Sequence, residues 1–204
     1  MKKIVIIGAN DFQNQLILKA KEMGFETHVF AWQDGSIGER TADHFYPVSI
    51  VEIDKILEKC REIKPDAVAT IASDLANITV SKVAAGLGLP GNTPECIELS
   101  TNKYAMRSAF LKAGLPTPKF YKVDRVIPEL MEMELPVIVK PTDRSGSRAI
   151  TKITAYDQLE EAIKEAVEQS FEKKAIVEES MKHYGKAIVC DSIEECVNIA
   201  NQIA

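Results

Sequence analysis

Residues 136–150, PVIVKPTDRSGSRAI, combine a short apolar strand with a small polar loop. The strand ends at Lys140, whose ammonium group starts near a buried sheet surface and is costly there unless an anion pairs with it. Small residues around Gly146 let backbone amides approach anionic oxygens closely. Further donors in the loop are Ser145, Ser147 and Arg148. Taken alone, the stretch fits two structures, an ordinary hairpin turn and a cover for phosphate groups.

Short strands surround this stretch in the second half of the chain. We expect strands at 119–123, 136–141, 148–153 and 174–179, with one helix at about 157–170. Strands at short spacing with one helix favour a small α+β unit with an antiparallel sheet. The tail then reads as a strand, a turn and a helix. Ser192 and Glu195 fit a capping box, and four apolar residues roughly share one face of the helix: Ile193, Val197, Ala200 and Ile203.

The first half instead alternates strand-like and helix-like segments, which predicts βαβ units and a parallel sheet. Strands are expected at 3–7, 26–32 and 66–73, and helices at 51–63 and 75–89. A further helix should begin after Asn10 or Asp11 and carry Phe12, Leu16, Ala20 and Met23 on one face. The fold class is therefore α/β, a Rossmann-like parallel-sheet domain followed by a small α+β subdomain. The expected boundaries are 1–95 for the first domain, 96–118 for a helical linker, 119–180 for the small subdomain and 181–204 for a strand-helix remnant.

Composition narrows the class of protein. A hydrophobic content of 46% with 27% charged residues is typical of a globular protein. The net charge of −5, without a Lys/Arg block, argues against nucleic acid as a partner. The apolar run Ile4–Ile7 is too short for a membrane span or a signal peptide. The cysteines, Cys60, Cys96, Cys190 and Cys196, form no CxxC pair and have no histidines at zinc spacing. We therefore expect scattered buried thiols and a reduced, cytoplasmic compartment.

Two strand ends in the first half are candidate substrate contacts, because ligands of open α/β sheets bind at the carboxyl edge. The first is the turn GANDFQNQ, where Asn10 follows the first strand. A dinucleotide fingerprint needs three glycines and this turn has Gly8 alone, so NAD is disfavoured. The second is Ser73 and Asp74, which follow the third strand. These two residues could contact substrate or could cap the next helix.

Three segments, in this order and spacing, resemble the ATP-grasp superfamily: NKYAMRSAFLKAGLPTPKF (102–120), PVIVKPTDRSGSRAI (136–150) and AIVEE (175–179). The first ninety residues look like the pre-ATP-grasp domain that precedes this fold, so the resemblance covers residues 1 to about 180. Within the superfamily, the pattern is similar to the carbamoyl-phosphate-synthase-like and amino-acid-ligase-like branch.

The resemblance implies a nucleotide site. Lys103 and Lys140 match the lysines that reach the phosphates, and residues 143–149 match the flexible lid. Glu178 matches the carboxylate that accepts from the adenine amine, with the backbone of Glu179 and Ser180 beside it. Two cations and a set of amides suit a triphosphate. The implied ATP-binding residues are Lys103, Lys140, Asp143, Ser145, Gly146, Ser147, Arg148, Glu178 and Glu179.

The family pattern breaks after Glu179. In the family a larger subdomain follows and holds two magnesium ions through an acidic residue and a Glu-x-Asn segment. Residues 181–204 are too few for it, so we expect that piece to be absent. Glu194, Glu195 and Asn198 do not reproduce the segment, so no metal ligand is assigned, and no catalytic residue either.

The resemblance implies, for a complete parent protein, ATP with Mg²⁺, small-molecule carboxylate and amine substrates, an acyl-phosphate intermediate and a homodimer. The alternative is a non-catalytic nucleotide-binding or protein-interaction module.

Overall fold

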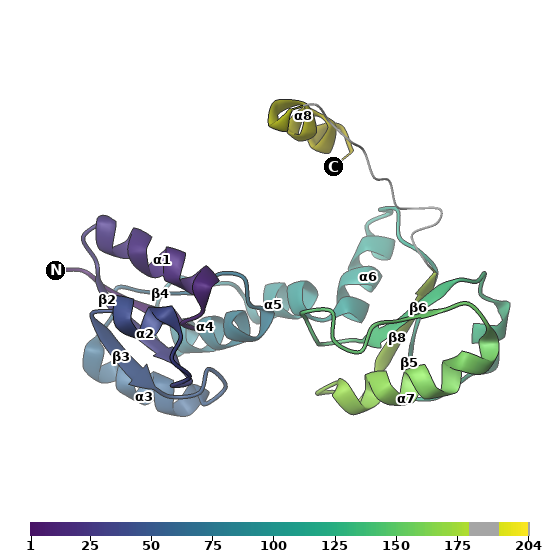
Figure 1. Cartoon of the computed structure of the whole chain (residues 1–204), viewed down its shortest axis with the longest axis horizontal. Helices are drawn as coiled ribbons and strands as arrows, with labels where there is room; N and C mark the ends of the chain where they lie inside the picture. Colours follow the sequence, from purple (N-terminus) through teal and green to yellow (C-terminus); the bar gives the residue numbers. More distant parts are fainter. Residues whose placement is uncertain (180–191, 204) are drawn as a thin grey trace. The chain divides into compact units, whose positions relative to one another are not determined.

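The computed structural model describes residues 1–179 and 192–203, with side chains up to residue 198. The chain divides into two compact units (Figure 1). The first contains residues 1–109 and 143–148, and the second contains residues 110–142 and 149–204. In the described residues no helix is long and apolar enough to cross a membrane.

A four-stranded parallel sheet forms the centre of the first unit. Its order is β3 (His44–Pro47), β2 (Glu26–Ala31), β1 (Lys3–Ile7) and β4 (Ala67–Ala69). The helices are α1 (Asp11–Glu22), α2 (Ile37–Thr41), α3 (Ile53–Ile63), α4 (Asp74–Leu87), α5 (Pro94–Thr101) and α6 (Lys103–Lys112), the last of which continues into the second unit. This parallel α/β arrangement confirms the predicted Rossmann-like fold class.

Successive side chains of β1 point to opposite faces of this sheet. Val5 and Ile7 pack in a core with residues of α3 and α4, whereas Ile6 packs with residues of α1. Strands buried on both faces read as continuous apolar runs, as the sequence of β1 does.

The predicted inner face of α1 is half wrong, because Leu16 and Ala20 pack toward the core but the other two residues do not. Phe12 and Met23 are 65% and 64% exposed, and the side chains that the helix buries include Gln13, Ile17 and Ala20. The helix is rotated because Gln13 is held inward. Its Oε1 accepts from the N–H of Asn10 at 3.3 Å, and its amide donates to the carbonyl of Ile71. A polar side chain with two backbone partners can occupy a core position that periodicity assigns to an apolar one.

The second unit contains the predicted antiparallel sheet. Its order is β5 (Phe120–Val123), β8 (Ala175–Glu179), β6 (Val137–Pro141) and β7 (Thr151–Ile153). Two 3₁₀ turns, Pro128–Glu132 and Tyr156–Gln158, and helices α7 (Leu159–Gln169) and α8 (Ile193–Ile203) complete the elements. One face of the sheet, with Val139 and Val177, packs against Leu159 and Ile163 of α7 in the core of this unit. The other face is therefore left to carry Lys140 and Glu178.

The tail is described in part. Ser192 accepts the N–H of Glu195 at 3.1 Å, which is one half of the predicted capping box. The strand expected in the tail lies outside the described residues. Ile193 and Val197 of α8 are 84% and 51% exposed, so the apolar face predicted for this helix is not buried at these two positions.

The expectation of buried thiols holds for one of the three described cysteines. Cys60 is fully buried in α3, whereas Cys96 and Cys196 are exposed. Periodicity does not separate them, because a small side chain fits either face of a helix.

Burial raises the pKa of the Cys60 thiol to about 12, and only the thiolate is nucleophilic. At pH 8 we expect a disulfide reagent to modify Cys96 and Cys196 rapidly and Cys60 only when the first unit unfolds. Peptide mass spectrometry after timed modification measures this. Fast labelling of Cys60 in the folded chain would contradict it.

Candidate nucleotide site

The outer face of the second sheet brings Lys140 of β6 and Glu178 of β8 together in an ion pair between Nζ and Oε1. Their side chains are 16% and 7% exposed. The pairing follows from register: Ile138 lies opposite Glu178 and Lys140 opposite Ile176, so all four side chains project from one face. Two of the residues predicted for ATP are therefore in direct contact.

This contact corrects one step of the sequence argument. The ammonium of Lys140 was expected to need a phosphate, because an unpaired cation beside a buried sheet is costly. Glu178 already supplies the opposing charge. A nucleotide phosphate would therefore share Lys140 with Glu178.

The loop that follows β6 has two residues in the left-handed region, Gly146 with φ 72° and Ser147 with φ 55°, and Ala149 directly after it has φ 50°. Gly146 adopts this conformation without steric cost. Residues 145–148 are exposed, and the side chains of Asp143 and Arg144 are half-buried. The loop therefore presents its backbone and serines to solvent, as a lid over a ligand must.

Lys103 is tied to the same loop. Its Nζ donates to the carbonyl of Arg144. The lysine is the first residue of α6, and Asn102 caps this helix, because its Oδ1 accepts from the N–H groups of Tyr104 and Ala105 at 3.0 and 3.1 Å. The cap fixes the direction in which Lys103 leaves the helix.

Glu179 ends β8. Its N–H donates to the carbonyl of Lys119 at 3.0 Å, so this donor is already used within the sheet. Ser180, which was expected beside it, lies outside the described residues.

Two of the three substrate candidates of the first unit cap helices. The Oδ1 of Asn10 accepts from the N–H groups of Phe12 and Gln13 and caps α1. Ser73 caps α4 through a hydrogen bond of 3.2 Å from the N–H of Ala76 to its Oγ. Asp74 is in the first turn of α4. Of the two uses considered for Ser73, the structure therefore shows the cap.

A groove of about 720 Å³ in the second unit contains none of the predicted ATP-binding residues. It is lined by the segment 124–126, Met131, Tyr156 and one side of α7. Since α7 packs on the face opposite Lys140, the groove belongs to the other side of this sheet.

One group of potential ligands was missed from sequence. Among the described residues, Glu26, His28 and His44 are the group of three whose ligand atoms all lie within 4.8 Å of one another. The group was missed because His44 lies on β3, which was not predicted. The sequence of this strand, HFYP, is short and ends in proline. The alternation of Glu26 and His28 on one face of β2 could have indicated two of the three.

Comparison with known proteins identifies the second half of the chain. Residues 110–203 match a family model described as D-ala D-ala ligase C-terminus. The carbamoyl phosphate synthase large chain, C-terminal section, of Methanocaldococcus jannaschii is 24% identical over 203 residues, covering 89% of this chain and 33% of the relative.

Solved structures share the fold of almost the whole chain. L-amino acid ligase from Bacillus licheniformis has a TM-score of 0.73 at 22% identity, over 88% of this chain and 44% of that one. N5-carboxyaminoimidazole synthetase from Staphylococcus aureus, complexed with ADP, has a TM-score of 0.70 at 18% identity, over 88% and 47%. The chain thus spans less than half the length of each of these three proteins. Residues 110–203 therefore match an ATP-grasp family model, and 88% of the chain shares the fold of ATP-grasp ligases.

Proposed function

We propose that this chain binds ATP, and that the whole protein joins a carboxylate to an amine at the expense of ATP. The observation that carries the proposal is the contact of Lys140 with Glu178 on the face of the sheet that α7 leaves open. The loop 143–148 directly follows this strand and is bonded to Lys103. The family match and the ADP-bound relative support the choice of nucleotide.

The chemistry of these side chains fits an adenine nucleotide. Lys103 and Lys140 offer ammonium groups to phosphate oxygens, and Glu178 offers a carboxylate to an exocyclic amine. Ile138 lies on the same face opposite Glu178 and is half-buried, so it provides an apolar surface for a base. Asp143, Ser145, Gly146, Ser147 and Arg148 complete the proposed lid, and Glu179 stays in the proposal through its backbone. ATP supplies the phosphoryl group that activates the carboxylate.

The proposal includes the remaining expectations. Magnesium would accompany ATP, although the one potential ligand group of three among the described residues contains none of the residues proposed for ATP. Asp74 is the substrate candidate whose side chain has no capping role in the structure. A relation to carbamoyl phosphate synthase in particular, a cytoplasmic location and a homodimer are further parts of the proposal.

Replacing Lys103 with alanine tests the lid contact. We expect the affinity for ADP to fall by about 1–2 kcal/mol, roughly five- to thirtyfold, because one charge-assisted contact to phosphate is lost. Isothermal titration calorimetry measures it. The control is Lys164→Ala, on the exposed side of α7. It removes the same charge from the other side of the second sheet and should leave the affinity for ADP unchanged. Equal affinities in both variants would exclude Lys103 from the site.

Turnover is tested on the full-length gene product with ATP, Mg²⁺ and a panel of amino acids and small carboxylates. We expect ADP release that depends on both a carboxylate and an amine. The second candidate is a nucleotide-binding module without turnover. Tight ADP binding without stimulated ADP release would support this second function.

A further inference from the structure

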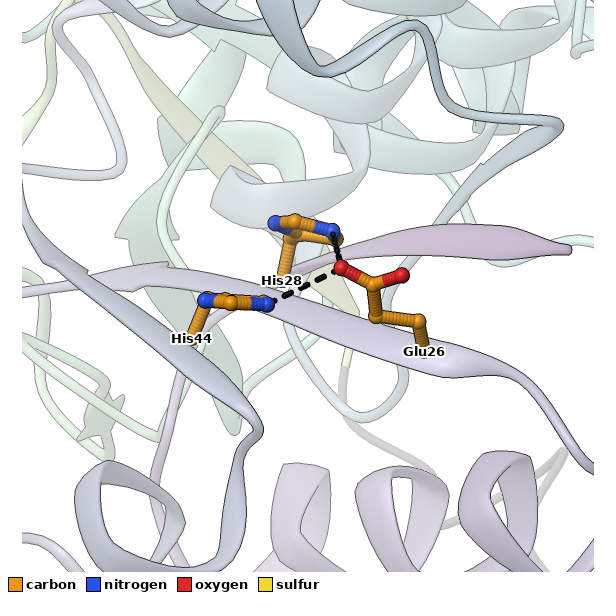
Figure 2. Close-up of side chains that lie close together, drawn as sticks. All are labelled: Glu26, His28 and His44. Atoms are coloured by element: carbon orange, nitrogen blue, oxygen red, sulfur yellow. Dashed lines mark hydrogen bonds and ion pairs between the residues drawn. The ribbon is translucent and has the colours of Figure 1, made fainter. Parts of the chain in front are cut away.

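Two histidines and a glutamate converge at the amino ends of β2 and β3 in the first unit (Figure 2). Glu26 and His28 are two residues apart on β2, so they project from one face, and His44 on β3 lies beside His28 in register. The imidazole rings of His28 and His44 stack with centroids 4.5 Å apart. Ligands of open α/β sheets bind at the carboxyl ends of the strands. This cluster therefore lies at the opposite edge from the one where substrate was sought.

One carboxylate oxygen faces both rings. Oε1 of Glu26 lies 2.9 Å from Nε2 of His44 and 3.2 Å from Nε2 of His28. In a tetrahedral zinc site with bonds of 2.0–2.1 Å, neighbouring ligand atoms lie about 3.3 Å apart. An ion could thus be accepted by a small outward movement of His44, whose side chain is 48% exposed.

Nε2 of His28 is the strongest indication of a ligand. His28 is 4% exposed, and this nitrogen makes no hydrogen bond within residues 1–179 and 192–203. Its contact with Oε1 of Glu26 at 3.2 Å is an ion pair only when the ring is protonated. An unsatisfied buried polar atom costs about 1–3 kcal/mol. A cation between this nitrogen and the carboxylate would remove the cost.

The surroundings favour Nε2 as the ligating atom. Nδ1 of His28 contacts the hydroxyl of Tyr46 at 3.0 Å, and a partner on one ring nitrogen leaves the other for a metal. Burial and, next, the nearby His44 lower the pKa of His28, whereas Glu26 opposes this shift. Lys3 is a cation close enough to affect His28, and its Nζ donates a hydrogen bond to the carbonyl of Ile63 at 3.1 Å.

The backbone that carries the three side chains is held in place by Thr27 and Asp43. Oδ2 of Asp43 accepts from the N–H and the hydroxyl of Thr27 at 2.9 and 2.8 Å, and Thr27 Oγ1 accepts from the N–H of Asp43 at 3.0 Å. Thr27 stands between Glu26 and His28, and Asp43 directly precedes His44. These bonds link the two strands beside the cluster, so binding requires little ordering of the backbone.

We propose that Glu26, His28 and His44 bind a borderline divalent transition-metal ion such as Zn²⁺, with water completing the coordination. Imidazole and carboxylate ligands suit this class of ion, and the exposed ring of His44 leaves a path from solvent. The bound ion cross-links β2 to the edge strand β3 and stabilises the first unit.

The test is a calorimetric titration of the metal-stripped chain with Zn²⁺ in a thiol-free reductant. We expect one ion per chain at this site and a higher melting temperature with Zn²⁺ but not with Mg²⁺. His44→Ala and Glu26→Gln should each weaken binding about a hundredfold, and Tyr46→Phe about tenfold through its contact with His28. Two ligand variants are used so that a folding defect in one does not decide the result.

The matched control is His183→Ala, which removes the remaining histidine of the sequence and should leave zinc affinity unchanged. Co²⁺ distinguishes this cluster from the cysteines, because thiolate ligands add an intense near-ultraviolet charge-transfer band that imidazole and carboxylate lack. The proposal is overturned if the chain binds no zinc, if His44→Ala and Glu26→Gln bind it as tightly as the parent, or if the cobalt spectrum shows thiolate.

Discussion

Replacing Lys140 with methionine is expected to destabilise the second unit by about 3 kcal/mol. The ammonium faces Glu178, whose side chain is 7% exposed, and loss of one member of a buried ion pair is strongly destabilising. The value is at the lower end for such pairs because Lys140 itself remains 16% exposed. Urea unfolding followed by circular dichroism measures the change.

The double variant Lys140→Met, Glu178→Gln is the control for this effect. It removes both charges, and replacement of a whole buried pair is often close to neutral. We therefore expect it to recover most of the stability that the single variant loses. A double variant as unstable as the single one would show that lost packing, not the lost ion pair, causes the destabilisation.

The same pair of variants separates stability from binding. We expect Lys140→Met to weaken ATP binding by about 1–3 kcal/mol, because a charge-assisted contact to phosphate is lost. The double variant should bind ATP as weakly although its fold is restored. Calorimetry below the melting temperature provides the affinities, and an unchanged affinity in both would remove Lys140 from the nucleotide site.

Replacing Ile163 with alanine is expected to destabilise the second unit by about 2–5 kcal/mol. Ile163 is 1% exposed and packs from α7 into the core formed with Val139 and Val177. The loss combines the transfer free energy of the deleted atoms with the cavity that remains. Urea unfolding measures it, and Glu165→Ala on the exposed side of α7 should change stability by less than about 0.5 kcal/mol.

Nucleotide affinity should be unaffected in Ile163→Ala under conditions in which the chain is folded. Ile163 contacts the inner face of the sheet, whereas Lys140 and Glu178 project from the outer face. A loss of affinity comparable to that of Lys140→Met would mean that the nucleotide lies on the α7 side, where the groove along that helix would hold it.

Regular patterns were readable from sequence. The apolar run of β1, the amphipathic α3 and the spaced strands of the second unit all appear in the structure, because burial imposes a period on side chains that the sequence must repeat. The ATP-binding residues were found from motif order and stay a prediction. β3 was not found, because an edge strand of four residues carries too little pattern to separate it from a loop.

Local chemistry was enough to predict two αβ units of different kinds and a resemblance to a superfamily, since periodicity, turn residues and motif order lie within short segments. Contacts between distant segments required the tertiary structure. Lys140 meets Glu178, 38 residues away, only through the register of β6 and β8. His44 meets Glu26 only because β3 pairs with β2. The register of strand pairing is set by how the complete faces of a sheet pack, and no single segment of sequence contains this information. The fold therefore decided which residue each charged side chain meets.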